Sequence, residues 1–207
     1  SSPFSPDQRP PNQDDAGDQH PYSVFVSRPL FHDYRAMICR FPDEGSFMGP
    51  TALPTFLACL PADERRYHSF SWRQHAVSQL NEGQPDWLQA LCEYWLGMDC
   101  AALEPDAFVY WTGLLQGEAM REFYDNFRRR MFDSAGALYW MFNDCWPATV
   151  SWSIVDYYLR RTPAFMPVKR SLAPLHAVVA LDGDEVAVFG INETDAPVAA
   201  ELRYGVF

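Results

Sequence analysis

Apolar positions repeat at helical spacing in two segments of the chain and form short runs elsewhere. Residues 86–96 and 105–132 carry apolar side chains three or four residues apart, which predicts two helices, the second being the longest in the chain. A shorter helix is predicted at residues 51–60, between prolines. The runs at 36–41 and 137–142 have the length of buried strands, and Pro42 is expected to end the first because proline cannot donate to a ladder.

Strand and helix patterns alternate as far as residue 173, and the pattern changes after Pro174. The alternation predicts a parallel α/β architecture. Residues 176–181, 185–191 and 199–206 are β-like runs separated by turns. They predict the opening of a β-sandwich, because three strands do not easily bury both faces of one. We therefore expect the chain to be cut at both ends.

Composition narrows the possible functions. Hydrophobic residues make up 48% of the 207 residues and aromatic residues 15%, which is ample material for a core. The net charge of −11 argues against nucleic acid and against anionic membranes as partners. No apolar run approaches the ~20 residues of a membrane helix. We expect the five cysteines to be buried free thiols, since their spacing fits neither a disulfide framework nor a zinc pair.

Hydrogen-bonding side chains and aromatic rings meet where the run at 137–142 ends. Asn143, Asp144 and Trp146 follow that run directly. A sugar needs partners for its hydroxyl groups and flat apolar surfaces for its C–H faces, so these residues predict a carbohydrate site. For Trp140, Trp146 and Trp152, packing in the core is the alternative, since tryptophan is mostly buried. No His-x-His spacing, Walker loop or glycine-rich dinucleotide loop is present, so we expect neither a metal nor a cofactor.

Glu44 is the strongest candidate for a catalytic residue. It follows the predicted strand at 36–41, and catalytic groups of a (β/α)₈ barrel lie at the C-terminal ends of strands. A retaining glycosidase needs one carboxylate to attack the anomeric carbon and a second to protonate the leaving group. Arg40 is expected to keep Glu44 ionised. We do not expect Asp43 to share the substrate, because neighbouring strand residues face opposite sides. The alternative for Glu44 is an exposed loop glutamate.

Four segments resemble motifs of the β-mannosidase-like branch of glycoside hydrolase family 2, one of them being residues 151–156 (SWSIVD), which match Ser-Trp-Ser-x-x-Asp. Residues 40–44 (RFPDE) are similar to the family's Arg-Phe-x-Ser/Asn-Glu segment, which carries the nucleophile and implicates Glu44. Residues 17–22 (GDQHPY) resemble Gly-Asp-x-His-x-Trp of an active-site loop, which implies that His20 and Tyr22 line the sugar pocket. Residues 140–147 resemble Trp-x-x-Asn-Asp-Cys-Trp-Pro, which implies substrate-binding roles for the members Trp140, Asn143, Asp144 and Trp146.

The resemblance also implies a fold and an activity. Residues 1–173 would be the C-terminal half of a (β/α)₈ TIM barrel, and residues 174–207 the first strands of an immunoglobulin-like β-sandwich. The implied activity is that of a retaining exo-β-glycosidase that acts on terminal β-linked sugars, above all β-mannosides. Its acid/base glutamate would lie upstream of this chain, so we expect the isolated chain to be inactive.

Three alternatives stay open at this point. The first is another exo-β-glycosidase of the same family, such as a glucosaminidase, a galactosidase or a glucuronidase. The second is a carbohydrate-binding protein that has the aromatic pocket but no catalysis. The third is an α/β domain with an unrelated function.

Overall fold

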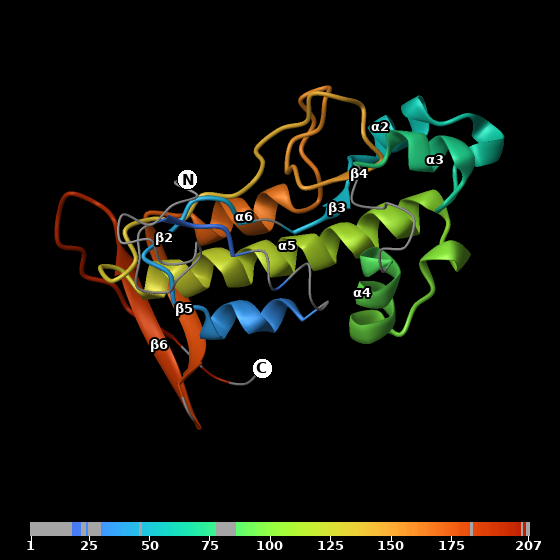
Figure 1. Cartoon of the computed structure of the whole chain (residues 1–207). Helices are drawn as coiled ribbons and strands as arrows, with labels where there is room; N and C mark the ends of the chain where they lie inside the picture. The colour runs from blue at the N-terminus through green and yellow to red at the C-terminus, as the bar shows by residue number, and fades with distance from the viewer. Residues whose placement is uncertain are drawn as a thin grey trace, which may run out of the picture.

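The computed structural model describes residues 18–21, 24, 30–45, 47–77, 86–182, 184–203 and 205. A long helix, α5 (Pro105–Arg129), forms the axis of the molecule, and most other elements pack along it (Figure 1). The helices that contact it are η1 (Phe31–Ala36), α2 (Leu53–Cys59), α4 (Trp87–Leu96) and α6 (Phe165–Ser171). Helix α3 (Phe70–His75) lies near α2. None of the described helices is long and apolar enough to cross a bilayer.

Helix α5 is long because apolar residues return on one face over its whole length. The side chains on this face are almost fully buried in the core: Phe108, Leu115, Met120, Phe123 and Phe127. The helix ends at Arg129, three residues before the predicted end at residue 132. Gln116 is also buried, and its Nε2 donates to the main-chain oxygens of Phe47 (3.0 Å) and Ser153 (3.3 Å). Helix α5 therefore holds the segments at Phe47 and Ser153 in place.

The two shorter predicted helices are also present. Helix α2 falls within residues 51–60, and α4 falls within residues 86–96. The boundaries of α4 follow from local chemistry. The Asp86 carboxylate accepts a hydrogen bond from the Gln89 main-chain nitrogen at 3.1 Å, which caps the first turn. Gly97 ends the helix in the left-handed conformation, with φ at 64°, where a side chain would be strained.

The two strands predicted before residue 174 are shorter in the structure than in the prediction. The run at 36–41 yields the end of η1 and the two-residue strand β2 (Phe41–Pro42), in which Pro42 is the last residue, as predicted. Proline lacks a donor, but its carbonyl oxygen accepts from the Leu138 main-chain nitrogen at 2.8 Å. The run at 137–142 forms a single parallel bridge between Tyr139 and Gly45 instead of a strand.

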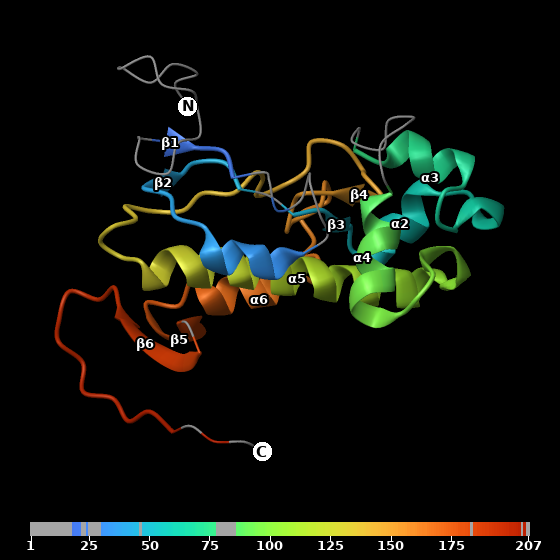
Figure 2. The ribbon, with the colours of Figure 1, turned by 60° about the horizontal axis from the view of Figure 1, so that its bottom comes forward.

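The other β-structure in the described residues consists of pairs of strands and of two isolated bridges at Val155. Strand β1 (Asp18–Gln19) pairs with β2 in parallel, and β3 (Gly49–Pro50) pairs with β4 (Val150–Ser151) in the antiparallel sense. The first of these pairs and the Tyr139 bridge place three parallel segments side by side, in the order 18–19, 41–45 and 139 (Figure 2). A fold of mixed helices and strands is thus confirmed, and the half (β/α)₈ barrel stays a prediction.

The last regular element is a hairpin of two eight-residue strands, β5 (Leu175–Asp182) and β6 (Glu185–Asn192). This confirms the runs predicted at 176–181 and 185–191. The third run is wrong for the described residues 199–203 and 205, which form no strand. One face of the hairpin buries Val178, Ala180 and Ile191, whereas the other exposes an apolar stripe made of Val179, Leu181, Val186 and Val188.

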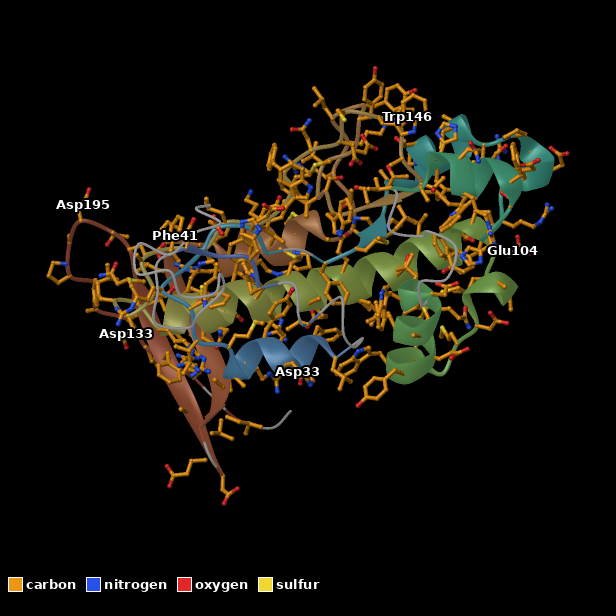
Figure 3. The ribbon with its side chains drawn as sticks, in the orientation of Figure 1. Asp33, Phe41, Glu104, Asp133, Trp146 and Asp195 are labelled. Carbon is orange, nitrogen blue, oxygen red and sulfur yellow. The ribbon has the colours of Figure 1, made fainter. Side chains whose placement is uncertain are left out.

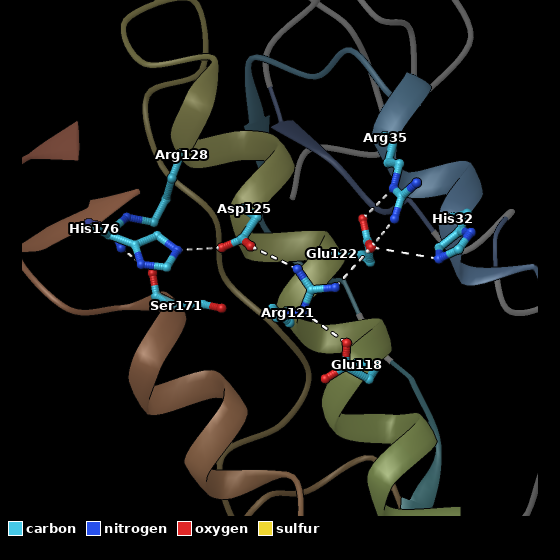
Figure 4. Close-up of polar contacts among 9 residues, drawn as sticks. All are labelled: His32, Arg35, Glu118, Arg121, Glu122, Asp125, Arg128, Ser171 and His176. Carbon is cyan, nitrogen blue, oxygen red and sulfur yellow. Dashed lines mark hydrogen bonds and ion pairs between the residues drawn. The ribbon is translucent and has the colours of Figure 1, made fainter. Parts of the chain in front are cut away.

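Buried charges join the hairpin, α5 and η1 (Figure 4). Arg35 on η1 donates from Nε to Glu122 Oε2 at 2.7 Å, and Arg121 lies 3.1 Å from Glu122 Oε1. At the next turn of α5, Asp125 Oδ1 lies 2.9 Å from His176 Nε2 on β5. Burial alone would raise the pKa of the Glu122 carboxyl, but the two arginines outweigh it and hold that pKa below its usual 4.5. The ionised form of Glu122 therefore stabilises the native state.

The free energy of unfolding should depend on Glu122 only where this carboxyl is ionised. Because its pKa is lower in the native state, its contribution is complete above the unfolded-state pKa and is lost as the pH falls through the native one. We expect Glu122→Gln to cost about 2 kcal/mol at neutral pH and progressively less as the pH falls below 4.5. Urea unfolding across this range measures the difference. Glu118→Gln, at a more exposed partner of Arg121, is the control and should cost less than about 1 kcal/mol.

Candidate active site

The register of β1 and β2 sets the geometry of the candidate site. Asp18 pairs with Phe41 and Gln19 with Pro42, so the next residues along the two segments, His20 and Asp43, become neighbours. The Asp43 main-chain nitrogen continues this pairing by donating to the Gln19 oxygen at 3.0 Å. The parallel direction means that both segments reach the site at their C-terminal ends.

The imidazole ring of His20 lies between two carboxylates. Its Nε2 is 3.3 Å from Asp43 Oδ1, and its Nδ1 is 3.5 Å from Glu44 Oε2. The side chains of His20 and Glu44 are 29% and 30% exposed, whereas that of Asp43 is only 13% exposed. Glu44 is therefore half-buried, and its Oε2 lies against the His20 ring. This differs from the alternative of a freely exposed loop glutamate.

Asp43 and Glu44 face the same ring, although the alternation of a strand would separate them. Strand β2 ends at Pro42, and Glu44 lies in a bend, so the two-residue period does not apply to them. Strand alternation therefore does not separate Asp43 from Glu44, whereas the expectation that Asp43 does not share the substrate stays a prediction. The signal that could have indicated this arrangement is the parallel register, which brings Asp43 to His20.

The segment around Trp140 adjoins Glu44 through the main chain. Gly45, the next residue, donates to the Leu138 oxygen at 3.1 Å and accepts from the Trp140 nitrogen at 2.7 Å. The Trp140 side chain is 47% exposed, so its ring is open to a ligand. Arg40, expected to support Glu44, is exposed, and its carbonyl accepts from the Ala135 nitrogen at 2.8 Å.

Asn143 and Asp144 have different surroundings. Asn143 is exposed, with its amide donating to the neighbouring Asp144 oxygen at 3.2 Å. The Asp144 carboxylate is only 4% exposed, and its two oxygens accept from the hydroxyls of Ser151 (2.6 Å) and Ser153 (2.7 Å). Burial raises the pKa of Asp144, although both serine hydrogen bonds act in the opposite direction. This carboxylate ties the ends of a loop together instead of facing an open site.

The Trp146 ring packs against a residue of another element. Its ring stacks on His75 of α3, with 5.3 Å between ring centroids and 21° between ring planes. Figure 3 shows Trp146 beside α2 and α3, whereas Phe41 of β2 lies toward the other end of α5. The stacking on His75 holds the exposed indole beside α3, and the contact of Trp146 with a sugar stays a prediction. Tyr22, the remaining predicted contact, lies outside the described residues.

Comparison with solved structures gives the fold a close counterpart. The β-D-mannosidase from Dictyoglomus thermophilum superimposes on 94% of this chain with a TM-score of 0.83 and 27% sequence identity. The resemblance to the β-mannosidases is confirmed. The chain spans 23% of the length of that β-mannosidase. An exo-chitosanase from Amycolatopsis orientalis shares the fold over 81% of this chain, with a TM-score of 0.59 at 22% identity.

Curated relatives support the same resemblance over a shorter stretch. β-Mannosidase B of Emericella nidulans is 47% identical over 77 residues, and its homologue in Aspergillus niger is 44% identical over the same number. These matches cover 36% of this chain and 9% of each fungal protein. No protein-family model matches the chain.

Proposed function

We propose that this chain is the nucleophile-bearing part of a retaining exo-β-glycosidase that acts on terminal β-mannosides. The contact between His20 and Glu44 carries the proposal, because it holds a half-buried carboxylate beside an exposed tryptophan at the end of parallel segments. The similarity to the Dictyoglomus thermophilum β-mannosidase over 94% of the chain supports the substrate class. Residues 1–173 would then form part of a (β/α)₈ barrel, with Glu44 at its C-terminal face.

The proposed reaction proceeds in two steps. Glu44 attacks the anomeric carbon, a C–O bond forms, and the glycosidic bond breaks as the leaving-group oxygen takes a proton from a second carboxylic acid. Water, deprotonated by that second group, then hydrolyses the glycosyl ester and frees Glu44. Trp140 would stack on a C–H face of the sugar, and Asn143 would hydrogen-bond a hydroxyl group. We assign Asp144 to holding the loop instead of to the sugar, because both of its oxygens accept from buried serines.

The hairpin supports the second proposed domain, residues 174–207. Its outer face exposes four aliphatic side chains, and cross-strand register pairs Val179 with Val188 and Leu181 with Val186. A two-stranded hairpin with one apolar face exposed is marginal in water, so further strands should cover it. A β-sandwich that begins here meets this requirement.

The activity of the 207-residue chain by itself tests whether the second carboxyl group lies in another part of the parent protein. We expect no turnover of nitrophenyl β-mannoside, because the second carboxyl group, required about 5–5.5 Å from the nucleophile, would come from residues outside the chain. The parent protein, meaning the longer protein of which we propose this chain to be a part, should hydrolyse the same compound under the same conditions. Turnover by the 207-residue chain that Glu44→Gln abolishes would contradict the expectation.

A panel of aryl β-glycosides tests the sugar specificity of the parent protein. We expect the largest kcat/KM for the mannoside, and lower values for the glucosaminide, galactoside and glucuronide. A preference for any of these three would keep the mechanism and replace the substrate. Binding of sugars without hydrolysis of any of the four would favour a non-catalytic carbohydrate-binding protein.

A further inference from the structure

Asp43 carries a carboxylate oxygen that the fold shields from water. Its Oδ1 has almost no solvent contact, although the residue lies in the segment that leads to Glu44. Burying a carboxylate oxygen is unfavourable unless a donor faces it. The structure places His20 Nε2 at 3.3 Å from this atom, within ion-pairing distance, so the ring is the charged partner of this oxygen when it is protonated.

The other nitrogen of the same ring faces the proposed nucleophile. His20 Nδ1 lies 3.5 Å from Glu44 Oε2, so the two carboxylates bind opposite edges of one imidazole. A histidine held at one nitrogen has a fixed ring plane, and that plane fixes where the second nitrogen points. An ionised carboxylate carries a negative charge, so both contacts are ion pairs when both nitrogens of the ring carry hydrogen.

We propose that Asp43 is a positioning residue, which orients the His20 ring and through it holds Glu44 for attack on the anomeric carbon. This inference rests on the proposed role of Glu44 as nucleophile. Asp43 itself does not touch the sugar in this arrangement. Its main chain is fixed by the hydrogen bond to Gln19 and its side chain is largely buried, so the carboxylate is a firm support for the ring.

The test uses the parent protein and a mannoside with a good leaving group. Asp43→Asn keeps the shape of the side chain and removes its charge. We expect kcat to fall about 10- to 100-fold, because a small misplacement of a reacting group has effects of this size. KM should stay within about twofold, since no sugar contact is lost. Asp43→Glu should recover part of kcat, and Asp133→Asn, at an exposed aspartate, should leave the kinetics unchanged.

A double-mutant cycle shows whether Asp43 acts through His20. In a His20→Ala background, Asp43→Asn should have almost no further effect on kcat, because the ring that transmits its influence is gone. Titration of active sites with a 2-deoxy-2-fluoro mannoside normalises the rates to folded protein, so a loss of stability cannot imitate the result. An equal effect of Asp43→Asn in both backgrounds would overturn the proposal, and so would an unchanged kcat in the single variant.

Failure of this inference is distinguishable from failure of the proposed function. If Glu44→Gln retains activity, Glu44 is not the nucleophile, and the role of Asp43 falls with it. If Glu44→Gln is inactive while Asp43→Asn behaves as the wild type, the function stands and only the positioning role is rejected.

Discussion

Replacing Glu44 by glutamine in the parent protein is expected to lower kcat for an aryl β-mannoside at least about a thousandfold. The amide has the size of the carboxylate, but it cannot form the glycosyl ester. The loss should appear in kcat and kcat/KM alike, because the bond to the anomeric carbon forms only on the way to the transition state.

The matched control is Glu118→Gln on helix α5. Its carboxylate pairs with Arg121 and is 38% exposed, close to the 30% of Glu44. This variant should keep the activity of the wild type. Steady-state kinetics of both variants give the comparison, and equal activity of Glu44→Gln and Glu118→Gln would contradict the assignment of the nucleophile.

Replacing Gly45 by alanine should damage both stability and activity. A Cβ atom at this position would lie 2.2 Å from Phe123 Cε2, well inside contact distance. Phe123 is fully buried and packs edge-on against Tyr34, Tyr124 and Phe127, so its ring has no space into which to move. We expect the variant to lose about 2–3 kcal/mol of unfolding free energy. Activity should fall as well, because the clash displaces the main chain at Gly45 and with it the neighbouring Glu44.

Two further variants separate the clash from a general effect of alanine. Gly190→Ala in the hairpin places its Cβ in open space, so it should cost less than about 0.5 kcal/mol. Phe123→Leu removes the ring edge that the new methyl group meets. It should therefore be less destabilising in the Gly45→Ala background than in the wild type. Additive losses in this cycle, measured by urea unfolding, would show that the predicted contact is not the cause.

The helices could be predicted from the sequence because their pattern is local. Apolar residues such as Leu115, Phe123 and Phe127 repeat along one face of α5, and each boundary of α4 has its own capping residue. The strands could not, because their existence depends on partners far away in the chain. Tyr139 pairs with Gly45 through a single bridge, and no pattern within residues 137–142 reveals how short that ladder is.

The candidate site divides in a similar way. His20 and Glu44 were found through motifs, and the structure brings them into contact. Asp43 was set aside because a rule for strands was applied beyond the end of β2. Asp144 looked like a sugar ligand, whereas Ser151 and Ser153 enclose it, and their spacing of two residues is a signal that could have indicated a shared carboxylate.

Trp146 shows a limit of motif reasoning in physical terms. A sequence identifies an aromatic ring that is free to stack, but it does not reveal the partner. In the structure the partner is His75, a residue without any recognisable pattern in the sequence. The His75 ring also holds the loop, because its Nδ1 lies 2.7 Å from the Pro147 oxygen.

Covalent labelling tests the central claim most directly. Incubating the parent protein with an activated 2-deoxy-2-fluoro-β-mannoside should trap the glycosyl ester, because the fluorine slows its hydrolysis. Peptide mass spectrometry should then find one fluorosugar on the carboxylate of Glu44, and none in the Glu44→Gln variant. A label on Asp43 or on any other carboxylate, or a turnover that forms no ester, would contradict the account.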